Sequence, residues 1–289
     1  MDLVLTAILA NGHVLIEGVP GVAKTLLARL TARLIDADFS RIQFTPDLMP
    51  SDVLGTTVFN MKTNGFDFHQ GPIFADIVLV DEINRAPAKT QSALFEVMEE
   101  RQISIDGTTH QMGELYTILA TQNPVEQEGT YKLPEAQLDR FLMKITMDYP
   151  SLEEEVNILE RHHTNAALVK LDNITPSITK EELLSLRAFM NQVFVDRTLL
   201  QYIALIVQQT RTSKAVYLGA SPRASVAMLQ SSKAYALLQG RDFVTPEDIK
   251  FVAPYVLQHR LILTAEAEME GYSPVKVTQR LIDKVEVPK

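Results

Sequence analysis

The sequence predicts an α/β nucleotide-binding core, with a parallel sheet of about five strands flanked by helices, followed by an all-helical domain. A glycine-containing loop at residues 18–25 lies between an apolar run and a helical pattern. A second apolar run, residues 77–80, ends in two carboxylates. After residue 150 the periodicity changes to helix throughout. We therefore expect a core domain at 1–150 and a helical domain at 151–289.

The loop Gly18-Val19-Pro20-Gly21-Val22-Ala23-Lys24-Thr25 follows Val14-Leu15-Ile16 and leads into a helical pattern that starts at Leu26. In a strand–loop–helix of this kind, backbone N–H groups and the helix N-terminus bind phosphate, the lysine reaches the outer phosphates, and the hydroxyl ligates Mg²⁺. Residues Gly18 to Leu26 are thus predicted to bind a nucleotide, with Thr25 on the metal. The alternative is a Gly/Pro turn before an amphipathic helix.

Ala23 stands where this type of loop usually has a glycine before its lysine. Alanine costs no backbone strain at that point if the residue already has helical dihedrals. The departure weakens the motif without refuting it.

The run Ile77-Val78-Leu79-Val80 is long enough for a buried parallel strand, and it ends at Asp81 and Glu82. A carboxylate here can hold the magnesium shell, and its neighbour can orient the attacking water. Asp81 is therefore the predicted second metal ligand, and Glu82 is the predicted activator of water.

The remaining elements of the core follow in order from apolar periodicity and turn residues. They are a helix at 2–10, a helix at 26–34, a strand at 41–44, a proline-bounded loop at 45–52, a hairpin at 58–68, a helix after Pro87, a hairpin at 103–112, and strands at 116–120 and 141–147. Asn64-Gly65 and Asp106-Gly107 mark the two hairpin turns, because both positions of such a turn need positive φ.

Helix-start patterns recur in the second domain, at Ser151-x-x-Glu154, Thr179-x-x-Glu182, Ser221-Pro222 and Thr245-Pro246-x-Asp248. Each places a hydroxyl where it can cap the first turn. Arg223 would then lie in the first turn of a helix capped by Ser221. The helix dipole disfavours a cation there, so an anion nearby would explain it.

Three other polar residues are candidates for the site. Asn123 follows the apolar strand after the acidic one and could help to place water, or could simply form an Asn-Pro turn. Arg140 precedes the last strand, where it could reach a neighbouring subunit's nucleotide or form a salt bridge with Asp139 or Glu135. Arg85 could pair with Glu82 or act across an interface, and a structural ion pair is the simpler interpretation.

Composition narrows the class of protein. The chain has 289 residues, 46% of them hydrophobic, and no cysteine, which excludes a disulfide framework and cysteine-based metal or nucleophile chemistry. The start lacks a basic leader, and no uncharged apolar run approaches the roughly 18 residues of a membrane span. We expect a cytoplasmic protein. A net charge of −9 makes a nucleic-acid partner unlikely.

With these motifs in place, the chain resembles the MoxR branch of the AAA+ ATPases. The segments that carry the resemblance are Gly-Val-Pro-Gly-Val-Ala-Lys-Thr at 18–25, Phe-Thr-Pro-Asp-Leu-Met-Pro-Ser-Asp at 44–52, Val-Asp-Glu-Ile-Asn-Arg-Ala at 80–86, Ala-Thr-Gln-Asn-Pro at 120–124, Pro-Glu-Ala-Gln-Leu-Asp-Arg-Phe at 134–141, and Gly-Ala-Ser-Pro-Arg at 219–223. Together they run from about residue 12 to near the end of the chain.

The resemblance implies ATP and Mg²⁺ as cofactors, a ring that is typically a hexamer with nucleotide, and remodelling of a protein client. It also implies that Asn123 is a first sensor, Arg140 an arginine finger acting on the neighbouring subunit, and Arg223 a second sensor carried by a helical lid. The two hairpins resemble inserts that project toward the central surface of a ring. A partner with a von Willebrand factor A domain often accompanies such proteins.

We therefore expect a Mg²⁺-dependent ATPase with chaperone-like activity in maturing protein complexes. Three alternatives stay open: a metal-chelatase motor subunit, a nucleic-acid motor, and a nucleotide-gated scaffold without turnover. The net charge of −9 disfavours the second. The intact Lys24, Asp81 and Glu82 argue against the third.

Overall fold

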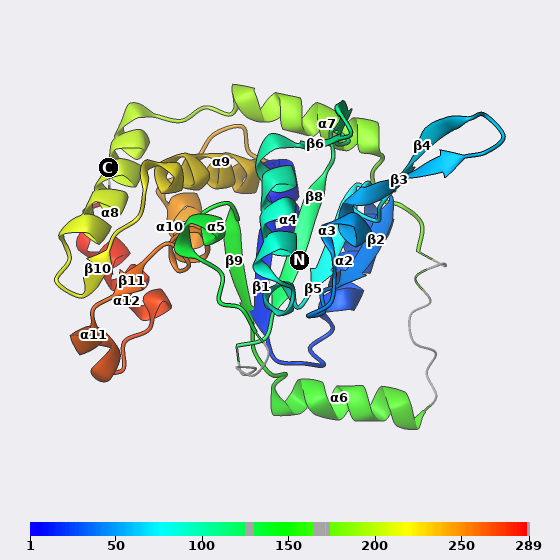
Figure 1. The fold of residues 1–289 in the computed structure, drawn as a ribbon. Coiled ribbons are helices and arrows are strands. Elements are labelled where there is room, and N and C mark those ends of the chain that lie inside the picture. Colours follow the sequence, from blue (N-terminus) through cyan, green and yellow to red (C-terminus); the bar gives the residue numbers. More distant parts are fainter. Residues whose placement is uncertain (125–129, 165–170, 172–173, 288–289) are drawn as a thin grey trace. The chain divides into compact units, whose positions relative to one another are not determined.

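The computed structural model describes residues 1–124, 130–164, 171 and 174–287 (Figure 1). The chain divides into two compact units. The core unit comprises residues 15–132 and 146–183, and the helical unit comprises residues 1–14, 133–145 and 184–289. The helical unit thus draws on three stretches of the chain, whereas the sequence predicted one division at residue 150. That functional division stays a prediction.

A parallel five-stranded sheet is present, as predicted. Its strands, in the order β2-β5-β8-β1-β9, are β2 (Phe39–Gln43), β5 (Ile77–Asp81), β8 (Thr117–Gln122), β1 (Val14–Gly18) and β9 (Met143–Met147). Strand β5 is buried along its whole length, which explains its continuous apolar run. Because β8 lies between β5 and β1, the residues that follow these three strands meet at one edge of the sheet.

The helices of the core unit are α2 (Lys24–Leu34), α3 (Pro50–Leu54), α4 (Ala88–Glu100) and α6 (Leu152–His163), with a short 3-10 turn η1 (Ile83–Arg85) after β5. Helix α2 packs against β5. Helix α4 buries Leu94, Val97 and Met98, the face expected from their spacing. The sheet and these helices hold the phosphate loop at the start of α2.

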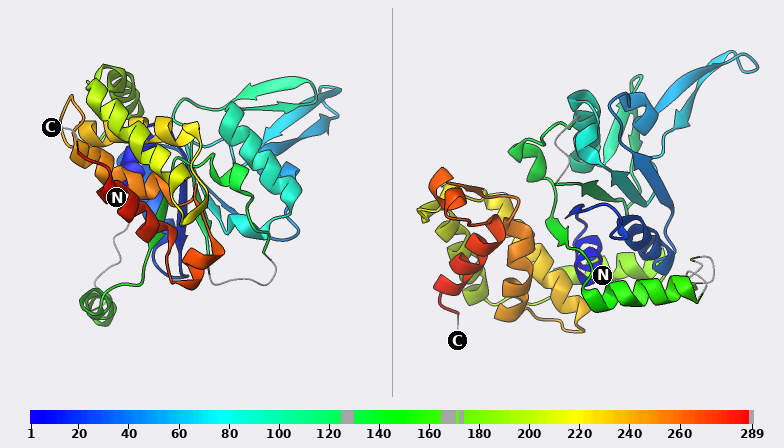
Figure 2. Two further views of the ribbon diagram at one scale, coloured as in Figure 1. Left: turned by 90° about the vertical axis from the view of Figure 1, so that its left-hand side faces the viewer. Right: turned by 90° about the horizontal axis from the view of Figure 1, so that it is seen from below.

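Both predicted hairpins are present, but only the second has the expected turn. Strands β6 (Gln102–Ile105) and β7 (Thr108–Gln111) are joined by Asp106 and Gly107, both at positive φ. Strands β3 (Gly55–Asn60) and β4 (Gly65–Gln70) instead pair Asn60 with Gly65, so the turn covers residues 61–64. The prediction of a two-residue turn at Asn64-Gly65 was wrong, because Gly65 is already a residue of strand β4. Hairpin β3–β4 projects well beyond the sheet of its own unit (Figure 2).

The helical unit contains α1 (Asp2–Leu9), α5 (Glu135–Leu138), α8 (Arg197–Thr212), α9 (Pro222–Leu238), α10 (Pro246–Leu257), α11 (Ala265–Met269) and α12 (Pro274–Lys284), with a 3-10 turn η3 (Met190–Gln192). Helix α7 (Lys180–Phe189) runs from the core unit into it. A short ribbon of β10 (Val216–Leu218) and β11 (Ile262–Leu263) interrupts the helices. The sequence did not predict this ribbon. Among the described residues, no helix combines the length and apolarity needed to cross a membrane.

Three of the four predicted helix caps are confirmed. Ser151 with Glu154, Thr179 with Glu182, and Thr245 with Asp248 each exchange hydrogen bonds across the first turn. Ser221 occupies the N-cap position of α9, but its side chain makes no capping hydrogen bond. Its hydroxyl donates instead to Asp139, 3.0 Å away.

Candidate functional site

The phosphate loop connects the end of β1 to the start of α2. Gly21 has φ +87°, a left-handed conformation that favours glycine. Lys24 is the first residue of α2, and its ammonium Nζ donates to the carbonyl of Gly18 at 2.7 Å. The lysine therefore curves back over the loop that it follows. The ammonium is thus held at the loop that precedes the N-terminus of α2, the arrangement of a phosphate-binding loop.

Ala23 does not have the helical dihedrals that would make alanine free of strain. Its φ and ψ are +59° and +26°, in the left-handed region. That conformation costs a residue with a Cβ about 1–2 kcal/mol. The loop must reverse direction immediately before α2, and this reversal explains why a glycine is usual here.

Ala23→Gly should therefore raise the free energy of unfolding, by up to about 1 kcal/mol, because relief of the left-handed strain is partly offset by the greater freedom of glycine in the unfolded chain. Urea denaturation measures the change. Ala28→Gly is the matched control, since Ala28 lies buried within α2. It should lose at least about 1 kcal/mol. A similar loss for Ala23→Gly would contradict the strained geometry.

Asp81 ends β5 and is 7% exposed. Its Oδ1 accepts from the Thr121 hydroxyl at 3.0 Å, and its Oδ2 accepts from Nε of Arg41 at 2.6 Å. Thr121 comes from β8 and Arg41 from β2, the two strands beside β5. The carboxylate is thus oriented from both sides.

Glu82, the next residue, also has left-handed dihedrals, φ +56° and ψ +50°. Its backbone N–H donates to the Thr121 hydroxyl at 3.0 Å. Its Oε2 accepts from Gln43 at 2.8 Å and pairs with Nε of Arg85 at 3.1 Å, so the ion pair expected between Arg85 and Glu82 is present. A strained glutamate held by three neighbours is typical of functional sites.

Sequence reasoning missed three residues of this site, namely Arg41, Gln43 and Thr121. Gln43 lies opposite Asp81 in the β2–β5 register. Their signal in the sequence was weak, being polar side chains near the ends of predicted strands. Only the strand order brings them to the two carboxylates.

Asn123 follows β8 and is 6% exposed. Because β8 lies between β5 and β1, Asn123 follows the strand that separates the carboxylates from the phosphate loop. The topology therefore places it at the edge where the sequence expected it.

A cavity of about 480 Å³ adjoins the phosphate loop within the core unit. Its lining combines Gly21, Val22 and Ala23 with the segment Met147–Pro150 and with Glu154, Asn157 and Ile158 of α6. The volume lies in the range of small-molecule sites, about 300–1,000 Å³, and the lining is largely apolar, as a nucleoside requires. The residues present thus fit a nucleotide with its phosphates on the loop.

The donor set also fits Mg²⁺ better than a tightly chelated metal. Among the described residues, no cluster of three or more His, Cys, Asp or Glu side chains could hold a metal ion. Magnesium usually takes only one or two protein oxygens and completes its shell with phosphates and water. One hydroxyl and one carboxylate, predicted from the sequence at Thr25 and Asp81, would match that mode of binding.

Arg140 and Arg223 belong to the helical unit. Arg140 follows α5, and Arg223 is the second residue of α9. Asp139, one of the two expected partners of Arg140, pairs with Arg260 at 2.6 Å. The sequence analysis did not predict that pairing.

Comparison with known proteins places these features in a family. Residues 13–143 match the profile of the ATPase family associated with various cellular activities (AAA), and residues 208–283 match that of the AAA lid domain. Chaperone MoxR1 of Mycobacterium tuberculosis is 44% identical, with 100% of this chain and 78% of MoxR1 aligned. The chain belongs to the MoxR family of AAA+ ATPases.

Other relatives of this MoxR-family chain agree with that assignment. The uncharacterised protein YeaC of Bacillus subtilis is 49% identical, covering 98% of this chain and 88% of YeaC. A crystal structure of a protein from Cytophaga hutchinsonii superposes with a TM-score of 0.90 at 42% identity, over 100% of this chain and 89% of that one. The predicted family and the predicted fold are both confirmed.

Proposed function

We propose that this MoxR-family protein hydrolyses ATP with Mg²⁺ as a ring assembly, hexameric with nucleotide, and uses the energy to remodel or mature protein complexes. The observation that carries the proposal is the shared sheet edge, where Asp81 ends β5 and Glu82 follows it, while the phosphate loop follows β1 in the same unit. Asp81 is held by Thr121 and Arg41, and Glu82 by Gln43 and Arg85.

Each side chain has a distinct task in this proposal. Lys24 and the backbone of residues 18–26 bind the phosphates of ATP. Thr25 and Asp81 would hold Mg²⁺, which supplies charge neutralisation on the phosphates when bound. Glu82 orients the attacking water and takes up its proton, and Asn123 helps to position that water. Gln43 and Arg85 both contact Oε2 of Glu82, which anchors that oxygen.

The assembly part of the proposal rests on arginines outside the core unit. Arg140 would act on the nucleotide of the neighbouring subunit, and Arg223 on the nucleotide of its own subunit. Functionally, residues 1–150 would form the nucleotide-binding core and residues 151–289 the helical lid. The name of the homologue Chaperone MoxR1 supports chaperone-like work on a protein client.

The tip of hairpin β3–β4 supports contact with a protein. Phe59 is 47% exposed, Phe66 73% and Met61 89%, although all three are apolar. The rings of Phe59 and Phe66 pack edge to face with centroids 5.3 Å apart. An exposed apolar group of this kind typically marks an interaction surface. A client, or a partner with a von Willebrand factor A domain, would supply the other side.

Lys24→Ala should weaken ATP binding by roughly one to two orders of magnitude, because a hydrogen bond to a charged group contributes about 1.5–3 kcal/mol. Binding of a fluorescent ATP analogue, with and without Mg²⁺, measures the loss. Lys89→Ala is the control, since Lys89 is an exposed lysine of α4 in the same unit. If both variants bound ATP like the unmodified chain, the phosphate-loop assignment would be wrong.

A further inference from the structure

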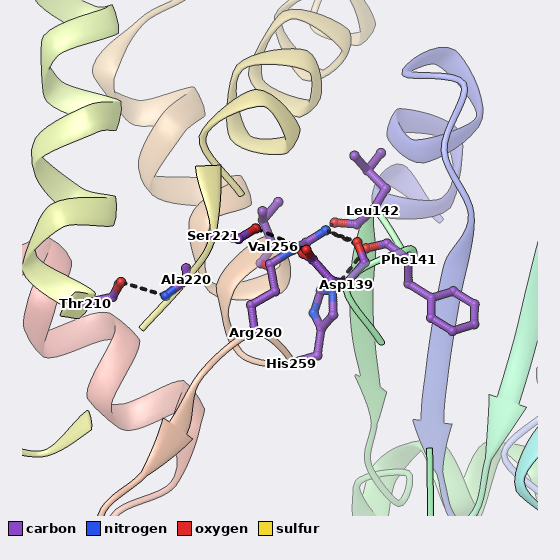
Figure 3. A network of polar contacts seen from close by, with 9 residues as sticks. All are labelled: Asp139, Phe141, Leu142, Thr210, Ala220, Ser221, Val256, His259 and Arg260. Atoms are coloured by element: carbon purple, nitrogen blue, oxygen red, sulfur yellow. Dashed lines mark hydrogen bonds and ion pairs between the residues drawn. The ribbon is translucent and has the colours of Figure 1, made fainter. Parts of the chain in front are cut away.

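Every N–H group of the Arg260 guanidinium has a hydrogen-bond acceptor. Its side chain is 4% exposed. Nε donates to the carboxylate Oδ1 of Asp139 at 2.6 Å, and Nη2 donates to the carbonyls of Asp139 at 3.2 Å and Phe141 at 2.7 Å. Nη1 donates to the carbonyl of Leu142 at 3.1 Å and to that of Val256. These five bonds match the five N–H groups of a guanidinium (Figure 3).

Three of the four bonded carbonyls flank Arg140 in the chain. Arg260 holds the carbonyls of Asp139, Phe141 and Leu142, so the backbone that carries the Arg140 side chain is fixed at three points. His259 adds a contact of 3.1 Å between its Nε2 and the carbonyl of Phe141. Burial lowers the pKa of Arg260 below its usual value, although the hydrogen bond and ion pair with Asp139 oppose that shift.

The same carboxylate reaches the start of α9. Oδ2 of Asp139 accepts from the hydroxyl of Ser221 at 3.0 Å, and Ser221 is the residue that precedes α9 and its Arg223 (Figure 3). The Ser221 hydroxyl therefore bonds to Asp139 and does not cap its own helix. A direct chain of contacts therefore runs from Arg260 through Asp139 to the first turn of α9.

The other side of this segment is anchored to α8. The N–H of Ala220 donates to the Thr210 hydroxyl at 3.0 Å, and Nε of Arg211 donates to the carbonyl of Ala220 at 2.9 Å. A Cβ on Gly219 would lie 2.8 Å from both the Cα of Arg211 and the carbonyl oxygen of Thr210, so only glycine allows this approach. The start of α9 is thereby clamped between α8 and Asp139.

We infer that Arg260 is a positioning residue which, through Asp139 and Ser221, holds Arg140 and Arg223 as one rigid pair of cations. Stability alone does not account for such a site, because well-packed apolar residues often stabilise a core as well as a buried ion pair does. The planar guanidinium of Arg260 instead orients the backbone, since its donors bind several carbonyls at once in a fixed geometry. This inference rests on the proposed function, in which Arg223 senses a subunit's own nucleotide and Arg140 acts on the neighbour's. Their rigid connection would transmit the nucleotide state of one site to the next.

Hydrogen–deuterium exchange tests the network without any need for catalysis. Arg260→Lys keeps the charge and loses the fork, and Ser221→Ala removes only the link to α9. Arg260→Lys should speed amide exchange by roughly tenfold in both 139–142 and 219–224, because local opening governs exchange. Ser221→Ala should speed amide exchange by a similar factor in residues 219–224. A change confined to residues near 260 in the first variant, or no change in the second, would overturn the rigid connection.

Rings that mix Arg140→Ala and Glu82→Gln subunits test whether the rigid connection matters for catalysis. Subunits with Arg140→Ala retain Glu82, and subunits with Glu82→Gln supply an intact Arg140 to them. Adding Ser221→Ala to the Glu82→Gln subunits should lower the rescued rate about tenfold, equivalent to ~1.4 kcal/mol. Adding Ser221→Thr, which keeps the hydroxyl, should restore most of it.

Ser273→Ala in the same subunits is the matched control, because the Ser273 side chain does cap its own helix α12. It should lower thermal stability and leave the rescued rate unchanged. If the mixture without Ser221→Ala shows no rescue, the shared active site of the proposed function fails, and the exchange experiment still decides the network. If the mixture is rescued and Ser221→Ala does not reduce the rate, the proposed function stands and only this inference fails.

Discussion

Glu82→Gln is expected to bind ATP nearly as tightly as the unmodified chain and to turn it over about 10²–10⁴-fold more slowly, the usual contribution of a general base. The amide has the same shape and removes only the group that takes up a proton. The amide oxygen of the glutamine can still accept from Gln43 and Arg85, which in the unmodified chain contact Oε2 of Glu82. The loss should therefore be in turnover.

Steady-state hydrolysis and binding of a labelled ATP analogue separate the two effects. Glu100→Gln serves as the control, because Glu100 is an exposed residue at the end of α4 in the same unit. It should leave both quantities unchanged. Equal loss of binding and turnover in Glu82→Gln would remove Glu82 from its proposed role and make it part of the binding site instead.

Arg140→Ala should lower hydrolysis by roughly 10³- to 10⁵-fold, the range for an arginine supplied to a phosphate-transfer site by a second protein. If Arg140 acts on the neighbouring subunit, mixing Arg140→Ala with Glu82→Gln restores part of the rate, since some sites then combine an intact arginine with an intact glutamate. The rate per subunit should also rise with protein concentration as rings assemble.

Arg197→Ala is the control for charge, because Arg197 is an exposed first-turn residue of α8 in the same unit. It should leave turnover and its concentration dependence intact. A flat rate per subunit, together with no rescue in the mixture, would mean that each subunit is self-contained, and the ring proposal would be wrong.

The two hairpins show what the local sequence can predict and what it cannot. Asp106-Gly107 forms the expected two-residue turn, with both residues at positive φ. Asn64-Gly65 has the same type of signal, yet the pairing of Asn60 with Gly65 makes a longer turn. The dipeptide predicted a hairpin correctly in both cases. Register was decided by the cross-strand pairs of the whole ribbon, including Phe59 opposite Phe66.

In the phosphate loop, the local sequence predicts the elements but not the conformation of Ala23. The pattern of residues 18–25 was sufficient to predict strand, loop and helix, because these elements are adjacent in the chain. The conformation of Ala23 was not predictable from it, because alanine by itself favours helical dihedrals and the observed left-handed ones are costly for it. Only the path between β1 and α2 decides between them.

The sequence by itself determined the family, the parallel sheet, the helical second part and the identity of Lys24, Thr25, Asp81 and Glu82 as candidates, because each depends on short patterns of neighbouring residues. The tertiary structure alone decided what surrounds them. Thr121 reaches Asp81 across 40 residues of chain, Ser221 reaches Asp139 across 82, and Arg260 reaches Asp139 across 121. Contacts over such separations leave no periodicity or spacing in the sequence, since they arise only when strand order and helix packing bring distant segments together.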